Sequence, residues 1–127
     1  MKITKFIAVT ALLMLGLVSF AQKGNPFLNN TPEYTKTITE RANKVVTTLG
    51  ITDSAQYKRV LSIMVEQSRY LSALHDFKDD LLKRAKTLPD KDARTTAIND
   101  SAQAQLYIGH AHFLAQLASE LNRDQIE

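Results

Sequence analysis

The chain has 127 residues, with 16 Lys and Arg against 13 Asp and Glu, a formal net charge of +3 and no Cys. The absence of Cys excludes disulfide bonds, thiol catalysis and thiolate metal sites. Lys2 and Lys5 lie in a predicted export signal, and their removal leaves 14 basic residues against 13 acidic ones, a net charge of +1. Nucleic-acid binding needs a basic surplus on one face, so this composition argues against nucleic acid as a partner.

Residues 1–21 have the features of a cleavable secretory signal peptide. Lys2 and Lys5 precede an apolar run from Phe6 to Phe20, and the small residues Ser19 and Ala21 stand two positions apart at the cleavage site. The apolar run is shorter than the roughly 20 residues that a membrane span needs, so no stable membrane anchor is expected after cleavage. With no Cys available for lipid attachment, we expect a periplasmic or secreted product.

A leader and a first helix are predicted next. Residues 22–30 show no hydrophobic periodicity, which is typical of a flexible leader. A helix is predicted over 32–49, with Thr31 as its N-cap, Pro32 at its first position and Gly50 at its C-terminal end. Its apolar residues recur at spacings of three and four and form one face: Tyr34, Ile38, Ala42, Val45 and Leu49.

Two long helices follow, over 53–87 and 91–121. We expect Thr52 to cap the first of them, Pro89 to end it, and Asp90 or Asp92 to cap the second. Gly109 interrupts the second helix, at a place where a neighbouring helix could pass closely. The predicted inward stripe of the first is Val60, Met64, Leu71, Leu74, Leu81, Ala85 and Leu88; that of the second is Ala93, Ala97, Ile98, Ala102, Leu106, Phe113, Leu114, Leu117 and Leu121.

These elements predict an all-α domain over residues 31–127, a three-helix antiparallel bundle joined by short turns. Near the C-terminus, Asn122 and Gln125 have the spacing of a capping box, which starts a helix. We therefore expect the domain to be a fragment of a larger helical domain, with a frayed tail as the alternative.

The three histidines are the first candidates for a metal site. His110 and His112 are two residues apart and lie on different faces of a helix, whereas a zinc pair on one helix needs a spacing of four. The antiparallel arrangement places His75 opposite about Gln103, roughly 10 Å along the axis from His110. His75 and Asp79 share a face, which is typical of a surface ion pair. No metal ligand and no cofactor is predicted.

The sequence favours a binding protein over an enzyme. Asp76, Asp79 and Asp80 lie on one helix among lysines, which indicates a solvated face and not two carboxylates facing each other across a cleft. No nucleophile elbow, phosphate loop or dinucleotide motif is present, so no catalytic residue is predicted. Tyrosines at helical spacing are mostly core-edge residues, and Tyr70 is kept as one candidate for ligand contact.

The chain resembles the secreted bacterial domain-of-unknown-function family 3826, some of whose members are described as sugar-binding proteins. The resemblance lies in Glu40-Arg41, Lys44-Val45-Val46, Leu49-Gly50-Ile51-Thr52-Asp53, Arg59-Val60, Leu74-His75-Asp76, Phe113-Leu114-Ala115, Glu120-Leu121-Asn122 and Gln125-Ile126-Glu127. It implies a helical domain that continues past residue 127 and a role in carbohydrate binding. Arg59, His75 and Asp76 are the polar positions that match, and with Tyr70 they form the predicted ligand-binding set.

A second resemblance supports an alternative function. Leu121–Gln125 is similar to the Leu-Thr-x-x-Gln motif of periplasmic helical stress chaperones, with Asn in place of Thr. It implies a chaperone or protein-interaction module that binds other chains on a helical surface. The oligomeric state is left open by the sequence.

Overall fold

The computed structural model of the protein describes residues 26–126, so the predicted signal peptide and residues 22–25 of the leader lie outside the described residues. Within these described residues, the helical elements occur in the order α2 (Pro32–Val46), the 3₁₀ turn η2 (Thr47–Leu49), α3 (Ser54–Ala85), α4 (Lys91–Glu120) and α5 (Arg123–Ile126). No strand occurs among the described residues. The prediction of an all-α fold with two long helices is therefore confirmed.

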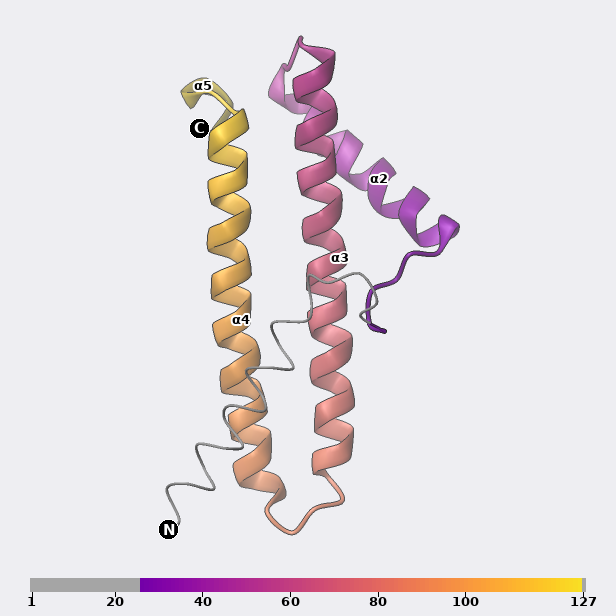
Figure 1. Ribbon diagram of the computed structural model, residues 1–127, viewed down its shortest axis with the longest axis vertical. Helices are drawn as coiled ribbons and strands as arrows, with labels where there is room; N and C mark the ends of the chain where they lie inside the picture. The colour runs from indigo at the N-terminus through magenta and orange to yellow at the C-terminus, as the bar shows by residue number, and fades with distance from the viewer. Residues whose placement is uncertain (1–25, 127) are drawn as a thin grey trace.

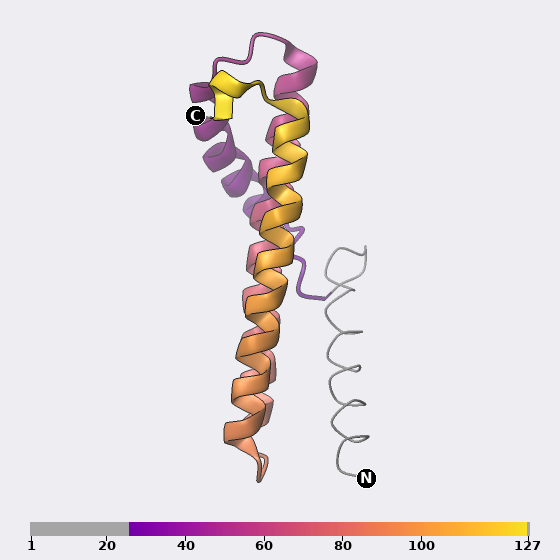
Figure 2. The same ribbon diagram turned by 90° about the vertical axis from the view of Figure 1, so that its left-hand side faces the viewer.

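α3 and α4 form a long antiparallel hairpin, and α2 crosses α3 obliquely near the start of α3 (Figure 1). In the perpendicular view α4 lies in front of α3 along its whole length (Figure 2). The hairpin register is defined by contacts at its open end and its middle. Arg59 and Gln56 of α3 both reach Glu120 of α4, and the Tyr70 hydroxyl donates to the backbone oxygen of Gln105 at 2.7 Å.

The helix ends show which local signals direct the fold. The Thr31 hydroxyl accepts from the Tyr34 amide as predicted, and Gly50 ends η2 with φ of 68°, a left-handed conformation that glycine adopts without steric cost. The predicted Thr52 cap was wrong by one residue. Asp53 is the N-cap of α3, because its carboxylate reaches the amides of Ala55 and Gln56.

Different side-chain hydrogen bonds occur before α4 and after it. Asp90 occupies the N-cap position, but its carboxylate accepts from Arg94 Nε at 2.7 Å and not from a helix amide. This hydrogen bond lowers the pKa of Asp90 below its ordinary value of 3.8. Beyond α4, the Asn122 side chain accepts from the Gln125 amide and the Gln125 side chain accepts from the Asn122 amide, both at 3.0 Å. The predicted capping box is confirmed, and it begins α5.

Part of the expected flexible leader packs against the hairpin. Phe27 and Leu28 cover the buried residues of the middle of α3, and the Phe27 ring meets the Phe77 ring edge-on with centroids 5.3 Å apart. Arg69 holds the same segment by donating to the backbone oxygen of Asn29 at 2.6 Å. Residues 26–30 of the leader form no helix, yet the apolar side chains of Phe27 and Leu28 still bury surface.

The hydrophobic core is small and unevenly distributed. The buried apolar residues are Ile38, Ala42 and Val46 of α2, Val60, Ala73, Leu74 and Ala85 of α3, and Ile98 of α4. Several residues predicted to face inward are exposed, among them Leu71, Leu88, Ala93, Ala97, Leu106 and Leu114. The prediction was wrong for α4 because this helix carries apolar residues around most of its circumference, so the expected stripe combined residues from two faces.

The helices are amphipathic or mixed in composition. Among residues 26–126, no helix combines the length and the apolar character that crossing a bilayer requires.

Candidate functional site

An open groove runs along the seam between α3 and α4. One hollow of about 450 Å³ has an apolar floor of Leu71, Leu74, Ala102 and Leu106 and polar walls of His75, Lys78, Asn99 and Gln103. A second hollow of about 300 Å³ shares Leu71, Gln103 and Leu106 with the first and adds Gln67, Tyr107 and His110. Because they share three lining residues, we treat the two hollows as one feature and call it the α3–α4 groove.

The groove follows from the register of the hairpin. On α3 its residues recur at spacings of three and four from Gln67 to Lys78, and on α4 they do the same from Asn99 to His110. In an antiparallel pair these two series run past each other, so that Lys78 lies at the Asn99 end and Gln67 at the His110 end. Leu71 and Leu106 meet midway, where each remains more than a third exposed.

The walls of the groove are mainly neutral and polar. Gln67, Asn99 and Gln103 carry amides, and His75 and His110 carry imidazoles; neutral forms of both groups donate and accept hydrogen bonds. Lys78 is the one formally charged residue among the groove residues given above. Tyr107 stands at the rim with 69% of its surface exposed.

His75 is the only member of the predicted ligand-binding set that lines the groove. Its Nε2 atom lies 3.3 Å from the Asp79 carboxylate, the i,i+4 pair expected from the sequence; the His75 side chain is exposed and that of Asp79 is about half exposed. Asp76 is exposed on the adjacent face of α3.

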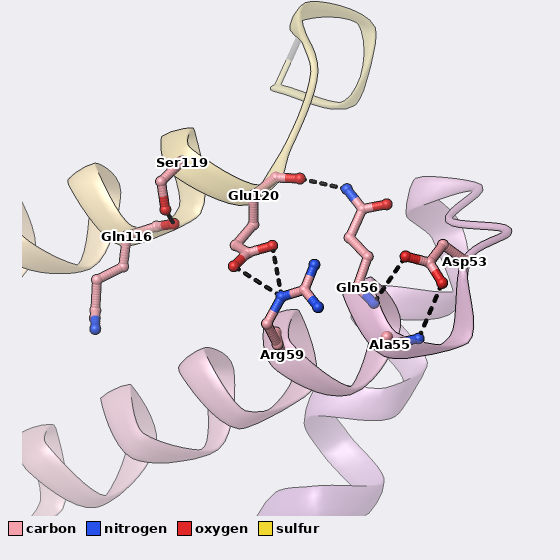
Figure 3. A network of polar contacts seen from close by, with 7 residues as sticks. All are labelled: Asp53, Ala55, Gln56, Arg59, Gln116, Ser119 and Glu120. Carbon is pink, nitrogen blue, oxygen red and sulfur yellow. Dashed lines mark hydrogen bonds and ion pairs between the residues drawn. The ribbon is translucent and has the colours of Figure 1, made fainter.

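Arg59 belongs to a polar cluster at the open end of the hairpin. Its Nε atom donates to both carboxylate oxygens of Glu120 at 3.0 Å, and the Gln56 amide donates to the backbone oxygen of the same residue (Figure 3). Sixteen residues separate Arg59 from His75, or ~24 Å along the helix, so one ligand of small size cannot contact both. The structure gives Arg59 a role in joining the end of α4 to the start of α3.

Tyr70 lies inside the hairpin and not in the groove. A Cβ atom added to Gly109 would lie 2.3 Å from Cε1 of the Tyr70 ring, so the close helix approach predicted at Gly109 is confirmed. Burial raises the pKa of Tyr70 above its ordinary value of 10.0. The four predicted residues are thus distributed among the groove, the hairpin interior, the hairpin end and the outer surface.

No metal centre accompanies the groove. Within the part of the chain that the structure describes, no three His, Cys, Asp or Glu side chains gather in a way that could hold a metal ion.

The sequence profile of the family described as "Protein of unknown function (DUF3826)" matches residues 35–127. The chain belongs to DUF3826. No curated protein matches it. The matched range contains nearly all of α2 and the whole of α3 and α4, so every residue of the α3–α4 groove lies within the DUF3826 region.

Sequence reasoning on this DUF3826 chain missed most of the groove. Four groove residues belong to no sequence motif, and their residue types are common on solvent-exposed helix faces: Gln67, Lys78, Asn99 and Gln103. The available signal was the register, since a turn near Pro89 already placed His75 opposite about Gln103. Extending that register along both helices would have identified the other groove residues of α3 and α4.

Proposed function

We propose that this DUF3826 domain is a binding module whose α3–α4 groove takes a neutral, hydroxyl-rich ligand of the carbohydrate class. The observation that carries the proposal is the composition of the groove: amide and imidazole side chains along both walls, above an apolar floor. The family resemblance to proteins described as sugar-binding supports the same class.

The chemistry of the walls favours hydroxyl groups over charged groups. A sugar hydroxyl both donates and accepts hydrogen bonds, as do the amides of Asn99 and Gln103 and a neutral imidazole. A phosphate or carboxylate ligand would need several cations, whereas Lys78 alone is available. The apolar floor suits the C–H faces of sugar rings.

The shape of the groove favours an extended ligand. It is open along its length, and from Asn99 to His110 it covers ~16 Å of helix. We therefore expect a short oligosaccharide to bind better than a single sugar.

Two matched pairs of substitutions test the proposal in calorimetric titrations with neutral oligosaccharides chosen from a glycan array. His110→Ala changes a groove residue, and His112→Ala changes the same residue type two positions away on another face. Gln103→Ala and Gln116→Ala form the second pair. Loss of one or two hydrogen bonds should weaken binding about 5- to 10-fold in each groove variant and leave its control unchanged.

Two outcomes would count against this function. An array on which no neutral glycan binds the protein would reject the carbohydrate class. Equal binding by the native protein and by both groove variants would show that the ligand binds elsewhere.

We further propose that this binding takes place outside the cytoplasm. The proposal rests on the predicted signal peptide, since residues 1–21 lie outside the described residues. Expression in a bacterial host followed by N-terminal sequencing should give a chain that begins at Gln22. A product that retains Met1 and stays in the cytoplasm would contradict export.

The exposed apolar surface of α4 favours a second candidate function, that of a helical chaperone or protein-interaction module. Tyr107, Ile108 and Leu114 are 69%, 61% and 50% exposed. Surfaces of this kind bind other proteins. The chaperone function predicts that the protein slows aggregation of a denatured client at equimolar ratio, and no slowing would exclude it.

A further inference from the structure

α4 presents a second apolar face on the side away from α3. We call this face the α4 stripe: Ala104, Ile108, Ala111, Leu114, Ala115 and Ala118, with Tyr107 at its edge. All of these residues are exposed, and their spacings of three and four place them on one side of the helix. The residues that meet α3, among them the buried Ile98 and the glycine against Tyr70, lie on the opposite side. Figure 2 shows no other described helix in front of this side of α4.

The composition of α4 shows that this face is not an ordinary solvated one. From Ser101 to Ser119 the helix has no Asp, Glu, Lys or Arg, although Ile98 is the only residue of α4 that is buried. Contiguous exposed apolar surface of this kind marks a contact with a partner. Helices that lie on membrane surfaces carry Lys and Arg on their polar face, and the corresponding part of α4 has none. The α4 stripe therefore suits a protein partner.

We propose that the partner is a second copy of this chain, with the two α4 helices packed antiparallel about a two-fold axis at Ala111. In that arrangement Ala111 meets its own counterpart, Ile108 meets Leu114 of the second copy, and Ala104 meets Ala118. The small residue at the axis lets the two helices approach closely, and the pairs of larger side chains close the contact on each side.

The charges at the ends of the α4 stripe favour the antiparallel direction. Asp100 is exposed at one end of the charge-free segment. Glu120 bounds the other end, where Arg59 of the same chain pairs with its carboxylate, and α5 begins just beyond it with Arg123 and Asp124. Antiparallel pairing brings Asp100 of one copy toward Arg123 of the other, whereas parallel pairing brings the two Asp100 carboxylates together. Like charges across an interface oppose association.

The area of the α4 stripe indicates a weak, reversible dimer. A large side chain has about 150–250 Å² of surface, so Tyr107, Ile108 and Leu114, each half to two-thirds exposed, contribute on the order of 100 Å² each. With the alanines, the interface buries about 900 Å² in total, which is below the roughly 1,200 Å² of stable specific interfaces and within the range of weak, transient ones. We expect a dissociation constant in the range of about 10–100 μM.

Charge substitutions at the proposed axis give a direct test by sedimentation velocity at concentrations from about 5 to 500 μM. The native protein should shift from monomer to dimer. Ala111→Glu and Ala111→Lys each place two like charges at the axis and should weaken the dimer at least about 10-fold. An equimolar mixture of the two variants should restore it. The matched controls are Gln116→Glu and Gln116→Lys, which add the same charges to an exposed position of α4 off the α4 stripe and should leave association unchanged.

Cross-linking gives a second measurement that does not depend on dimer strength. The native chain has no Cys, so Ala111→Cys introduces a single thiol that should form a disulfide between copies on mild oxidation. Gln116→Cys should remain reduced under the same conditions. A native protein that stays monomeric at the highest concentration would overturn the dimer. If this monomeric native protein also slows client aggregation, the α4 stripe binds client proteins instead of a second copy. Dimers of undiminished strength in both Ala111 charge variants would overturn the proposed face. Failure of their mixture to associate would overturn the two-fold axis at Ala111.

Discussion

The contact between Gly109 and Tyr70 makes Gly109→Ala the most informative single substitution. On helix propensity alone, Ala should stabilise α4 by about 1 kcal/mol relative to Gly. The added Cβ, however, would lie 2.3, 2.7 and 2.9 Å from Cε1, Cζ and Oη of Tyr70. The ring is held by its hydrogen bond to the Gln105 oxygen at 2.7 Å, so the helices must separate or the ring must leave.

The cost of this overlap should exceed the gain in propensity. Overpacking costs about 1–3 kcal/mol and loss of the tyrosine hydrogen bond about 1 kcal/mol, so we expect a net destabilisation of roughly 1–3 kcal/mol. Urea unfolding followed by circular dichroism should show a midpoint lower by roughly 1 M. The unfolding should be measured at about 2 μM protein, where association between copies of the chain contributes nothing to stability.

A double-mutant cycle separates the clash from other effects. In a Tyr70→Ala background the ring is absent, and Gly109→Ala should then stabilise the fold by about 1 kcal/mol, reversing its sign. The reasoning fails if Gly109→Ala raises the midpoint in the native background. It also fails if the substitution has the same effect in both backgrounds, because the two positions would then not interact.

Three further substitutions test contacts that join separate elements. Tyr70→Phe should cost about 1 kcal/mol at neutral pH. Because the pKa of Tyr70 is raised in the folded chain, the protonated hydroxyl stabilises the fold fully below pH 10.0, and this stabilisation is lost as the pH rises through the raised pKa. The Tyr70→Phe variant should therefore lose less stability than the native protein when urea unfolding is repeated at alkaline pH. Arg59→Ala breaks a contact to Glu120 that is half exposed on the arginine side, so the loss should be only about 0.5 kcal/mol, with faster amide exchange confined to the last turn of α4. Phe27→Ala removes the ring that packs on Phe77 and should cost about 1–2 kcal/mol in thermal unfolding, and an unchanged midpoint would show that the leader adds no stability.

Much of the secondary structure could be predicted because its signals are local. The hydroxyl of Thr31, the left-handed Gly50 and the reciprocal bonds of Asn122 and Gln125 each act within a few residues along the chain. The same is true of the His75–Asp79 pair. The error at Thr52 has a local cause as well, since two neighbouring residues can both cap a helix and only the backbone decides which one points at the free amides.

The groove and the core depend instead on how distant segments meet. Periodicity shows that α4 has apolar residues but not which of its faces meets α3, because both faces are apolar; Leu114 was assigned inward and is half exposed. The leader gave no periodic signal although Phe27 packs on α3.

The helices, their order and the short turns between them could thus be predicted from the order of the amino acids, since these features depend on hydrogen bonds between near neighbours in the chain. Three contacts became known only from the packed helices: Arg59 joins the hairpin ends, Tyr70 fills the space at Gly109, and His75 shares a groove with Asn99 and Gln103. The reason is physical: side-chain packing acts between residues that are close in space, and the sequence predicts which residues those are only when the register of the hairpin is known.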